Sequence, residues 1–215
     1  MKLLFVTATN TNIGKTYTTL RLIHHFSQQN IAVGVCKPIE TGVEEEPMDA
    51  KLLLEAVQQY NPKFKNLSPK EITAYTFSLP AAPFCADKEQ SISIDKIKEK
   101  IKALSHLCDL LIIEGAGGLM VPITAEYLMI DLIEALEAKT LLVTPSRLGC
   151  INDTLLSIHT LQQRGIAFDW CVNLFEDQEA FKVVTQPFYD KLFPQWWTLS
   201  HGIEQYVKNY SNNAL

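Results

Sequence analysis

A glycine, a lysine and a threonine stand side by side at Gly14, Lys15 and Thr16, shortly after the apolar run "KLLFV". At such a place a glycine lets the backbone approach an anion, the lysine can reach the β- and γ-phosphates, and the hydroxyl can ligate Mg²⁺. The N-terminus of a following helix would add partial positive charge. The segment therefore predicts a loop that binds a nucleoside triphosphate, although Thr9, preceded by Ala8, stands where the common pattern has its first glycine.

Further residues that could do chemistry follow other apolar runs. Lys37, in "VCKPIETG", either enters the phosphate crevice or reaches the surface as an ordinary lysine, and Thr41 is either a hydroxyl ligand or a turn residue. Glu114 lies between "LLII" and "GAGG", where a buried carboxylate needs a partner or a metal. Asp49 either supplies a second carboxylate for magnesium or caps the helix that it begins.

The elements that must position these residues alternate along the chain. Apolar runs without alternation predict strands that are buried on both faces, at residues 3–6, 31–36, 110–113 and 141–144, and a further strand is expected at residues 168–173. Helical spacing of apolar residues predicts helices at residues 15–29, 49–60, 94–104, 128–137 and 151–164. This order predicts an α/β fold, a parallel sheet with helices on both faces in the three-layer α/β/α arrangement of P-loop NTPases.

The expected sheet also explains where the candidate residues fall. Ligands of open parallel sheets bind beyond the carboxyl ends of the strands, and residues 14–16, Lys37, Glu114, residues 145–150 and Asn173 each lie at the end of a predicted strand or directly after one. The tail after residue 173 is expected to be less regular. Its Trp196 and Trp197 either stack on a nucleotide base or pack in the core, and the composition of such segments favours packing.

Composition limits the possible partners. The 215 residues, 47% of them hydrophobic and 20% charged, predict one catalytic domain over residues 1–215. No apolar run approaches the roughly 18 residues of a membrane span and no export signal is seen, so we expect a cytoplasmic protein. The net charge of -5 argues against nucleic acid and favours small molecules. The five cysteines are scattered, which indicates neither a zinc site nor disulfides.

Six segments in the order "ATNTNIGKT", "CKPIETG", "MDAKLL", "AYTFSLPAAP", "IEGAGG" and "RLGCINDTLL" resemble the dethiobiotin synthetase family. The resemblance covers about residues 3–175. The loop of that family usually begins with glycine, threonine, any residue and threonine. Ala8 replaces the glycine here, while Thr9 and Thr11 match, so the unusual loop resembles the family's own variant.

The resemblance implies an ATP- and Mg²⁺-dependent ligase of biotin biosynthesis. Such enzymes carboxylate 7,8-diaminononanoate with CO₂ and close the cyclic urea dethiobiotin, through a carbamate and a carbamic-phosphoric anhydride. Lys37 and Lys15 would be catalytic. The ATP-binding residues would be Asn12, Ile13, Gly14, Lys15, Thr16, Tyr17, Asp49, Glu114, Gly115, Ala116, Gly117 and Asn173. The metal would be held by Thr16, Asp49 and Glu114, and the substrate by Thr41, Gly149, Cys150, Ile151 and Asn152.

The same resemblance implies a homodimer with a shared site. The backbone N–H groups of Cys150, Ile151 and Asn152 would be free donors at the start of a helix, and such donors suit a carboxylate. In the family this helix start belongs to the partner subunit. Without the family, Gly149 would mark only a turn from a strand to a helix.

A second class of function stays open, that of a partition or positioning ATPase that acts through nucleotide-dependent dimerisation and partner binding. Such proteins carry a signature lysine five residues before the lysine of the loop, where this chain has Asn10. Asn173 matches the base-reading asparagine of the dethiobiotin synthetases, whereas the N-K-x-D motif of guanine binders is absent. A preference for ATP is therefore implied by the resemblance alone.

Overall fold

The computed structural model describes residues 2–214, and its centre is a five-stranded sheet in the order β2-β5-β1-β6-β7. All neighbouring strands in it are parallel. The strands are β1 (Lys2–Ala8), β2 (Val33–Cys36), β5 (Leu110–Gly118), β6 (Lys139–Thr144) and β7 (Phe168–Val172). The predicted parallel sheet is confirmed, and each strand lies within a few residues of its expected range.

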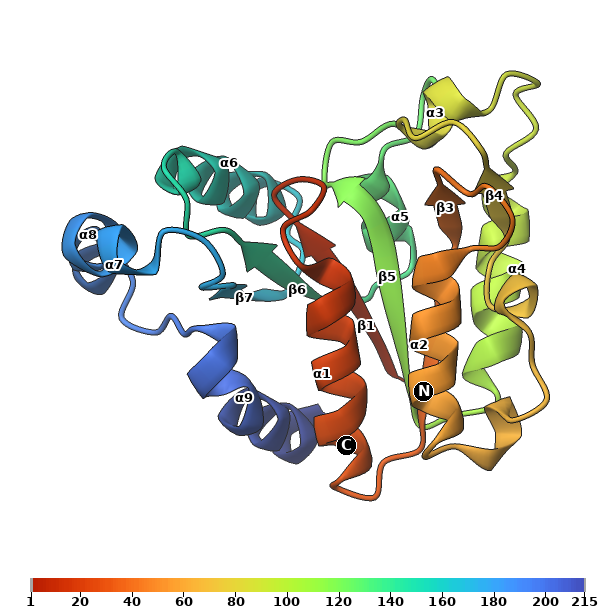
Figure 1. Ribbon diagram of the computed structural model, residues 1–215, viewed down its shortest axis with the longest axis horizontal. Helices are drawn as coiled ribbons and strands as arrows, with labels where there is room; N and C mark the ends of the chain where they lie inside the picture. Colours follow the sequence, from red (N-terminus) through yellow and green to blue (C-terminus); the bar gives the residue numbers. More distant parts are fainter. Residues whose placement is uncertain (1, 215) are drawn as a thin grey trace.

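Helices cover both faces of this sheet (Figure 1). Helices α1 and α2 pack against each other, α9 packs against α1, and these three lie in front of the sheet in Figure 1, with α4 and α5 behind it. The long helices are α1 (Lys15–Ser27), α2 (Met48–Gln58), α4 (Ile94–Ser105), α6 (Cys150–Gln163) and α9 (Leu199–Ala214). The predicted three-layer α/β/α fold is therefore confirmed.

Shorter elements fill the connections. A second sheet pairs two three-residue strands in parallel, β3 (Ile39–Thr41) and β4 (Tyr75–Phe77). The short helices are α3 (Pro83–Ala86), α5 (Met129–Ala135), α7 (Gln178–Ala180) and α8 (Gln186–Leu192), with further helical turns at Pro62–Phe64, Pro69–Glu71 and Phe181–Thr185.

The tail differs from the expectation of a less regular segment, because α9 runs over 16 residues. Its residues Leu199, Ile203, Tyr206 and Val207 are buried at helical spacing, and the ring of Tyr210 meets that of Phe26 on α1 edge to face. The helix therefore closes the core beside α1.

The core lies around the central strands. Side chains of β1, β5 and β6 are excluded from solvent on both faces, as in Phe5, Ile112 and Leu142. Such burial requires apolar side chains at successive positions, which is why the strands read as uninterrupted apolar runs. The carboxyl ends of β1, β2 and β5 meet at one edge of the sheet, and this edge carries the candidate site.

Candidate active site

The loop between β1 and α1 has the geometry of an anion-binding site. Gly14 adopts a φ of 100°, and a Cβ there would lie 2.3 Å from Nδ2 of Asn173, so both the backbone conformation and the close approach require glycine. No side chain caps α1, and its first turn holds no acidic residue. The N–H groups and the positive end of this helix are therefore available to a negatively charged ligand.

Two lysines lie at this edge of the sheet. Lys15 is 7% exposed, and its Nζ donates to the carbonyl oxygen of Asn10 at 2.9 Å, which curls the side chain back over the loop. Lys37 is 3% exposed, so it is not a surface lysine. Nζ of Lys37 lies 2.6 Å from Oε1 of Glu114 and 3.2 Å from Oδ2 of Asp49. The alternative of a lysine that reaches the surface is thereby excluded.

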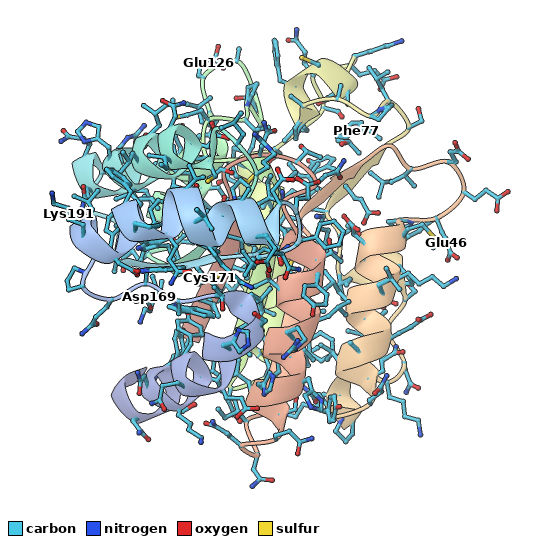
Figure 2. All side chains as sticks on the ribbon, turned by 60° about the vertical axis from the view of Figure 1, so that its left-hand side comes forward. Glu46, Phe77, Glu126, Asp169, Cys171 and Lys191 are labelled. Atoms are coloured by element: carbon cyan, nitrogen blue, oxygen red, sulfur yellow. The ribbon has the colours of Figure 1, made fainter. Side chains whose placement is uncertain are left out.

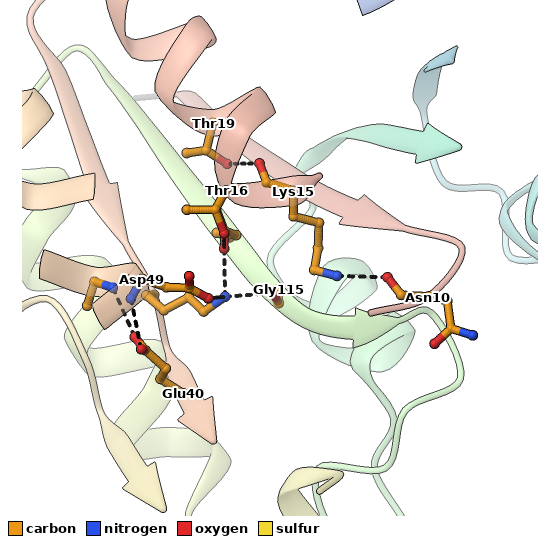
Figure 3. Close-up of polar contacts among 10 residues, drawn as sticks. Asn10, Lys15, Thr16, Thr19, Glu40, Asp49 and Gly115 are labelled. Carbon is orange, nitrogen blue, oxygen red and sulfur yellow. Dashed lines mark hydrogen bonds and ion pairs between the residues drawn. The ribbon is translucent and has the colours of Figure 1, made fainter. Parts of the chain in front are cut away.

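A hydrogen-bond network joins these charges to the loop (Figure 3). Oγ1 of Thr16 donates to Oε1 of Glu114 at 3.0 Å, and Nζ of Lys37 also donates to the carbonyl oxygen of Gly115 at 3.3 Å. Asp49 turns its carboxylate to Lys37, whereas the residue that precedes α2 is Pro47. Asp49 is therefore part of the charge cluster and is not the cap of α2.

The electrostatics of the two lysines differ. Burial lowers the pKa of Lys15 to about 8, and the nearby charge of Lys37 adds to this effect. Burial also acts to lower the pKa of Lys37, but the attraction and hydrogen bonds of Glu114 and Asp49 outweigh it and hold this pKa above its ordinary value. Lys37 is thus a fixed positive charge, while the charge of Lys15 depends on what binds beside it.

One oxygen of this cluster stands out. Oε2 of Glu114 is buried and has no hydrogen-bond partner within the described residues. A buried carboxylate oxygen without a donor is costly, so a ligand that coordinates it would relieve the cost. No group of three or more His, Cys, Asp or Glu residues that could hold a metal ion by itself is present in residues 2–214. Any metal here would draw further ligands from hydroxyl, phosphate and water oxygens, the environment that Mg²⁺ prefers.

A cleft of about 390 Å³ opens over the network. The predicted site residues that line it are Asn12, Gly14, Lys15, Thr16, Tyr17, Lys37, Thr41, Asp49, Ala116 and Gly117. The structure therefore brings together residues from four separate parts of the chain. Glu114, Gly115 and Ile13 do not line the cleft. Glu114 and Gly115 accept hydrogen bonds from Nζ of Lys37, which does line the cleft, and Ile13 is buried within the loop.

Several lining residues were not predicted. Glu40 on β3 is buried at the cleft, and Ala81, Ala82 and Pro83 form part of its wall. The segment "AYTFSLPAAP" resembles the family without suggesting a role for any of its residues, and only the three-dimensional structure places its end here. The signal for Glu40 was a carboxylate beside Thr41 in "KPIETG", too short a pattern to interpret.

Other predicted residues lie elsewhere. Asn173 follows β7, and its Nδ2 donates to the carbonyl oxygen of Ile13 at 3.0 Å, so it supports the loop from behind. Residues 149–152 begin α6 and do not line the cleft. The N–H of Cys150 already donates to the carbonyl oxygen of Arg147 at 3.0 Å, and its side chain is buried. The expectation of a free donor is therefore wrong for Cys150.

The two tryptophans of the tail pack against the core. The ring of Trp197 stacks on that of Tyr206 at 5.1 Å, and the ring of Trp196 lies 5.7 Å from that of Tyr189. Neither indole lines the cleft over the loop. In the described chain these tryptophans are packing residues, as the sequence favours.

The fold and this cleft define a P-loop nucleotide-binding protein, and the AAA domain family matches residues 2–169. The chain is 57% identical over 209 residues to the ATP-dependent dethiobiotin synthetase BioD of Sulfurovum sp. (strain NBC37-1), covering 97% of this chain and 100% of that protein. It is 37% identical to the protein of the same name from Wolinella succinogenes, and the match covers 95% of this chain and 96% of that protein. The chain therefore belongs to the ATP-dependent dethiobiotin synthetase family.

Solved structures with the same fold are more distant. One is a chain of the MinC:MinD cell division protein complex from Aquifex aeolicus. Its TM-score is 0.55 and its identity is 16%, over 97% of this chain and 86% of that one. For a ParA family ATPase from Chlorobium tepidum the TM-score is 0.53 and the identity is 10%, over 99% of this chain and 94% of that one. At such identities the likeness shows the fold alone. It adds no support to a partition or positioning function.

Proposed function

We propose that this protein is the ATP-dependent ligase that carboxylates 7,8-diaminononanoate with CO₂ to form dethiobiotin. The observation that carries the proposal is the buried Lys37, held by Glu114 and Asp49 beside the phosphate-binding loop, in a chain of this family. Two ammonium groups and a free helix N-terminus line the cleft, where a triphosphate and a carbamate, both negatively charged, would approach each other. Without such positive charge the two anions would repel.

The reaction consists of three transfers. One amine of the substrate attacks CO₂ and loses a proton, which gives a carbamate. A carbamate oxygen then attacks the γ-phosphorus of ATP, the bond to the β-phosphate oxygen breaks, and ADP leaves. The second amine attacks the carbonyl carbon of the resulting carbamic-phosphoric anhydride, loses a proton, expels inorganic phosphate and closes the cyclic urea.

The residues act mainly by position and charge. Lys15 and the N–H groups at the start of α1 hold the β- and γ-phosphates, and Lys37, directly after β2, faces the transferred group from the other side of the cleft. Charge on the phosphoryl oxygens is greatest during transfer, so a fixed ammonium stabilises the transition state more than the bound substrates. Thr41 lines the same cleft and offers its hydroxyl to the diamine or its carbamate.

The donor set fits Mg²⁺. Oε2 of Glu114 has no hydrogen-bond partner in residues 2–214, Thr16 supplies a hydroxyl to the same carboxylate, and Asp49 adds a second carboxylate across Lys37. These three residues would hold the ion directly or through its water molecules. When bound, Mg²⁺ supplies positive charge to the β- and γ-phosphate oxygens.

The working unit that we propose is a homodimer. Exposed apolar side chains occur between residues 148 and 156, at and before the start of α6, and on the segment after β7. Helix α6 touches that segment where the hydroxyl of Tyr189 donates to Oγ1 of Thr154 at 3.0 Å. The exposed apolar residues are Leu148, Leu156, Phe175, Val183, Val184, Phe188 and Leu192. We call them the apolar face. An apolar face of this kind on a protein that binds small molecules indicates a protein interface.

The homodimer would also complete the site. Lys191, on α8, lies on the opposite side of the molecule from Glu46, in the loop before α2 (Figure 2). The N–H groups of Ile151 and Asn152 make no hydrogen bond within the described residues, and they lie beside the apolar face. A partner subunit that packs on this face would bring these donors to the substrate carboxylate of the neighbouring cleft.

One assay tests the proposed reaction. The protein is incubated with 7,8-diaminononanoate, bicarbonate, Mg²⁺ and ATP, and dethiobiotin is detected by mass. We expect dethiobiotin, ADP and phosphate in equal amounts, and none of them when the diamine is left out. ATP hydrolysis without dethiobiotin would contradict the proposal.

Three further parts of this proposal concern the chain as a whole. One contiguous core runs from Leu4 to Tyr210, which supports a single catalytic domain. No helix in the described range 2–214 has the length and apolar character needed to cross a membrane. A cytoplasmic location stays a prediction, and co-fractionation of the native protein would test it.

A further inference from the structure

Glu40 is a buried carboxylate that none of the roles above uses. It lies on β3, is 7% exposed and lines the cleft next to Lys37 and Thr41. Burial raises the pKa of Glu40, although two hydrogen bonds from backbone N–H groups oppose this effect. A buried carboxylate in this place needs a structural or functional reason.

The contacts of Glu40 are both with the start of α2. Its Oε1 accepts the N–H of Asp49 and its Oε2 accepts the N–H of Ala50, each at 2.9 Å (Figure 3). The residue before α2 is Pro47, which makes no side-chain hydrogen bond to the helix. The first N–H groups of α2 are therefore satisfied by a strand residue that precedes the helix by several positions.

Asp49 depends on this arrangement. Its side chain is 41% exposed, and among the described residues its carboxylate makes one ion pair, with Lys37 at 3.2 Å. The direction in which its carboxylate points is thus set by where the backbone of residues 49 and 50 is held. Glu40 holds that backbone through two charge-assisted hydrogen bonds.

We propose that Glu40 is a positioning residue: its carboxylate fixes the first turn of α2 to β3 and so keeps Asp49 opposite Lys37, ready to bind the metal of the site. The proposal rests on the proposed function, in which Asp49 helps to hold Mg²⁺. A cap with a purely structural role would change the stability of α2 but not the metal dependence of the reaction. The two roles are therefore separable by experiment.

The first test uses backbone amide exchange without any ligand. In the parent protein we expect the amides of Asp49 and Ala50 to exchange as slowly as those in the middle of α2, although they lie in its first turn. In Glu40→Gln, one oxygen is kept but the second N–H faces an NH₂ group, so one of the two amides should lose its protection. Fast exchange of both amides in the parent would overturn the proposal.

The second test measures the Mg²⁺ concentration that gives half-maximal dethiobiotin formation. For Glu40→Ala we expect a rise of about tenfold, and a smaller rise for Glu40→Gln, which keeps the shape of the side chain. Ser93→Ala is the matched control. It removes a cap from α4, where Oγ of Ser93 accepts the N–H of Lys96, and should lower stability without a shift in the Mg²⁺ curve.

A double-mutant cycle shows whether Glu40 acts through Asp49. In an Asp49→Asn background, Glu40→Ala should cause almost no further shift in the Mg²⁺ requirement, because the ligand that it positions has already been lost. The proposal would be overturned if Glu40→Ala raised the Mg²⁺ requirement by the same factor in the Asp49→Asn background as in the parent. A Glu40→Ala titration curve that overlays that of the parent would overturn it as well. If Glu40→Ala does not fold, Glu40→Gln serves in the same cycle. If the parent forms no dethiobiotin, the proposed function fails, while the amide exchange still tests the contact.

Discussion

The two regions that we propose as ligand sites differ in how far a single chain prepares them. In the phosphate half, formed by residues 8–16 with Lys37, Asp49 and Glu114, Lys37 and Glu114 are buried, and Lys37 pairs with both carboxylates within one chain. In the anchor half, formed by residues 148–152 and the apolar face, Leu148 is 90% exposed and Phe175 is 77% exposed. The first region is complete in the monomer, whereas the second has the features of a surface that is completed by another molecule.

The difference follows from the cost of exposing each kind of group. Ammonium and carboxylate groups can stay charged inside a protein only with partners at hand, so the phosphate half must be assembled before ATP arrives. Backbone N–H groups at a helix start and apolar side chains on a surface cost little in water until a partner covers them. In the proposed homodimer, the anchor half would therefore stay open in the monomer and close on association.

The largest expected effect is a loss of turnover when a residue of the phosphate half is replaced. Lys37→Leu should lower turnover by about 10³-fold or more, because the fixed ammonium stabilises charge that develops during transfer, while ATP binding stays largely intact. The measurement is steady-state dethiobiotin formation together with ATP binding. Lys139→Leu is a suitable control, since Lys139 pairs with Asp169 at 2.8 Å but does not line the cleft. Near-normal turnover in Lys37→Leu would exclude the proposed role.

The next effect is the recovery of activity in mixed dimers, which tests whether the two halves of a site come from different subunits. Gly149 has a φ of 92° at the start of α6, and Gly149→Trp would block the anchor half. When Lys37→Leu and Gly149→Trp are refolded together, each heterodimer has one site with both halves intact. Since half of the dimers are mixed and one of their two sites is intact, we expect about a quarter of the parent activity.

The control for this experiment lies at the other end of the same helix. Gly165 also has a positive φ, of 64°, and free space around it, so Gly165→Trp imposes a comparable strain away from the proposed anchor. It should stay active by itself. Inactive mixtures that contain confirmed heterodimer, or a parent that sediments as a monomer at assay concentration, would refute the shared site.

A smaller effect concerns the metal within the phosphate half. Glu114→Gln and Asp49→Asn should each raise the Mg²⁺ concentration for half-maximal activity by about tenfold, because each removes a negatively charged oxygen ligand or a partner of its water. Glu46→Gln is the control, a carboxylate paired with Lys51 near the surface. Titration curves of both site variants that coincide with that of the parent would make the carboxylates structural.

The two regions also differ in what the sequence could predict. The phosphate half was recognisable because its strands are buried on both faces and its loop is a local pattern, so Lys15 and Glu114 follow directly from their neighbours in the chain. Lys37 and Asp49 needed the family resemblance, since each residue alone suits a surface or a helix cap. The contacts of Asp49 depend on how α2 packs beside β3, which no local pattern encodes.

The features that sequence reasoning missed share one cause. Glu40 acquires its role from β3 and β4, each three residues long and too short for a periodic signal. Helix α9 was missed because Gly202 interrupts its pattern, and a Cβ there would lie 2.7 Å from Trp197. In both places a tertiary contact decides the residue type and hides the local preference.

The smallest expected effect measures how far the phosphate half is prepared before ATP arrives. Burial and the charge of Lys37 lower the pKa of Lys15 to about 8. At about pH 8, Lys15 is therefore uncharged in about half of the protein molecules. Bound triphosphate restores the charged form. Binding of metal-free ATP should therefore take up about half a proton at about pH 8 and nearly one at about pH 9, with affinity falling as the pH rises.

Calorimetry in buffers of different ionisation enthalpy, with EDTA present, measures this uptake directly. Lys15→Arg is the matched variant, because a guanidinium keeps its proton over this range and removes the uptake whatever its effect on affinity. Binding without proton uptake at either pH would mean that Lys15 is fully charged in the free protein. The phosphate half would then be completely prepared in advance, and its contrast with the anchor half would be sharper than the lowered pKa of Lys15 indicates.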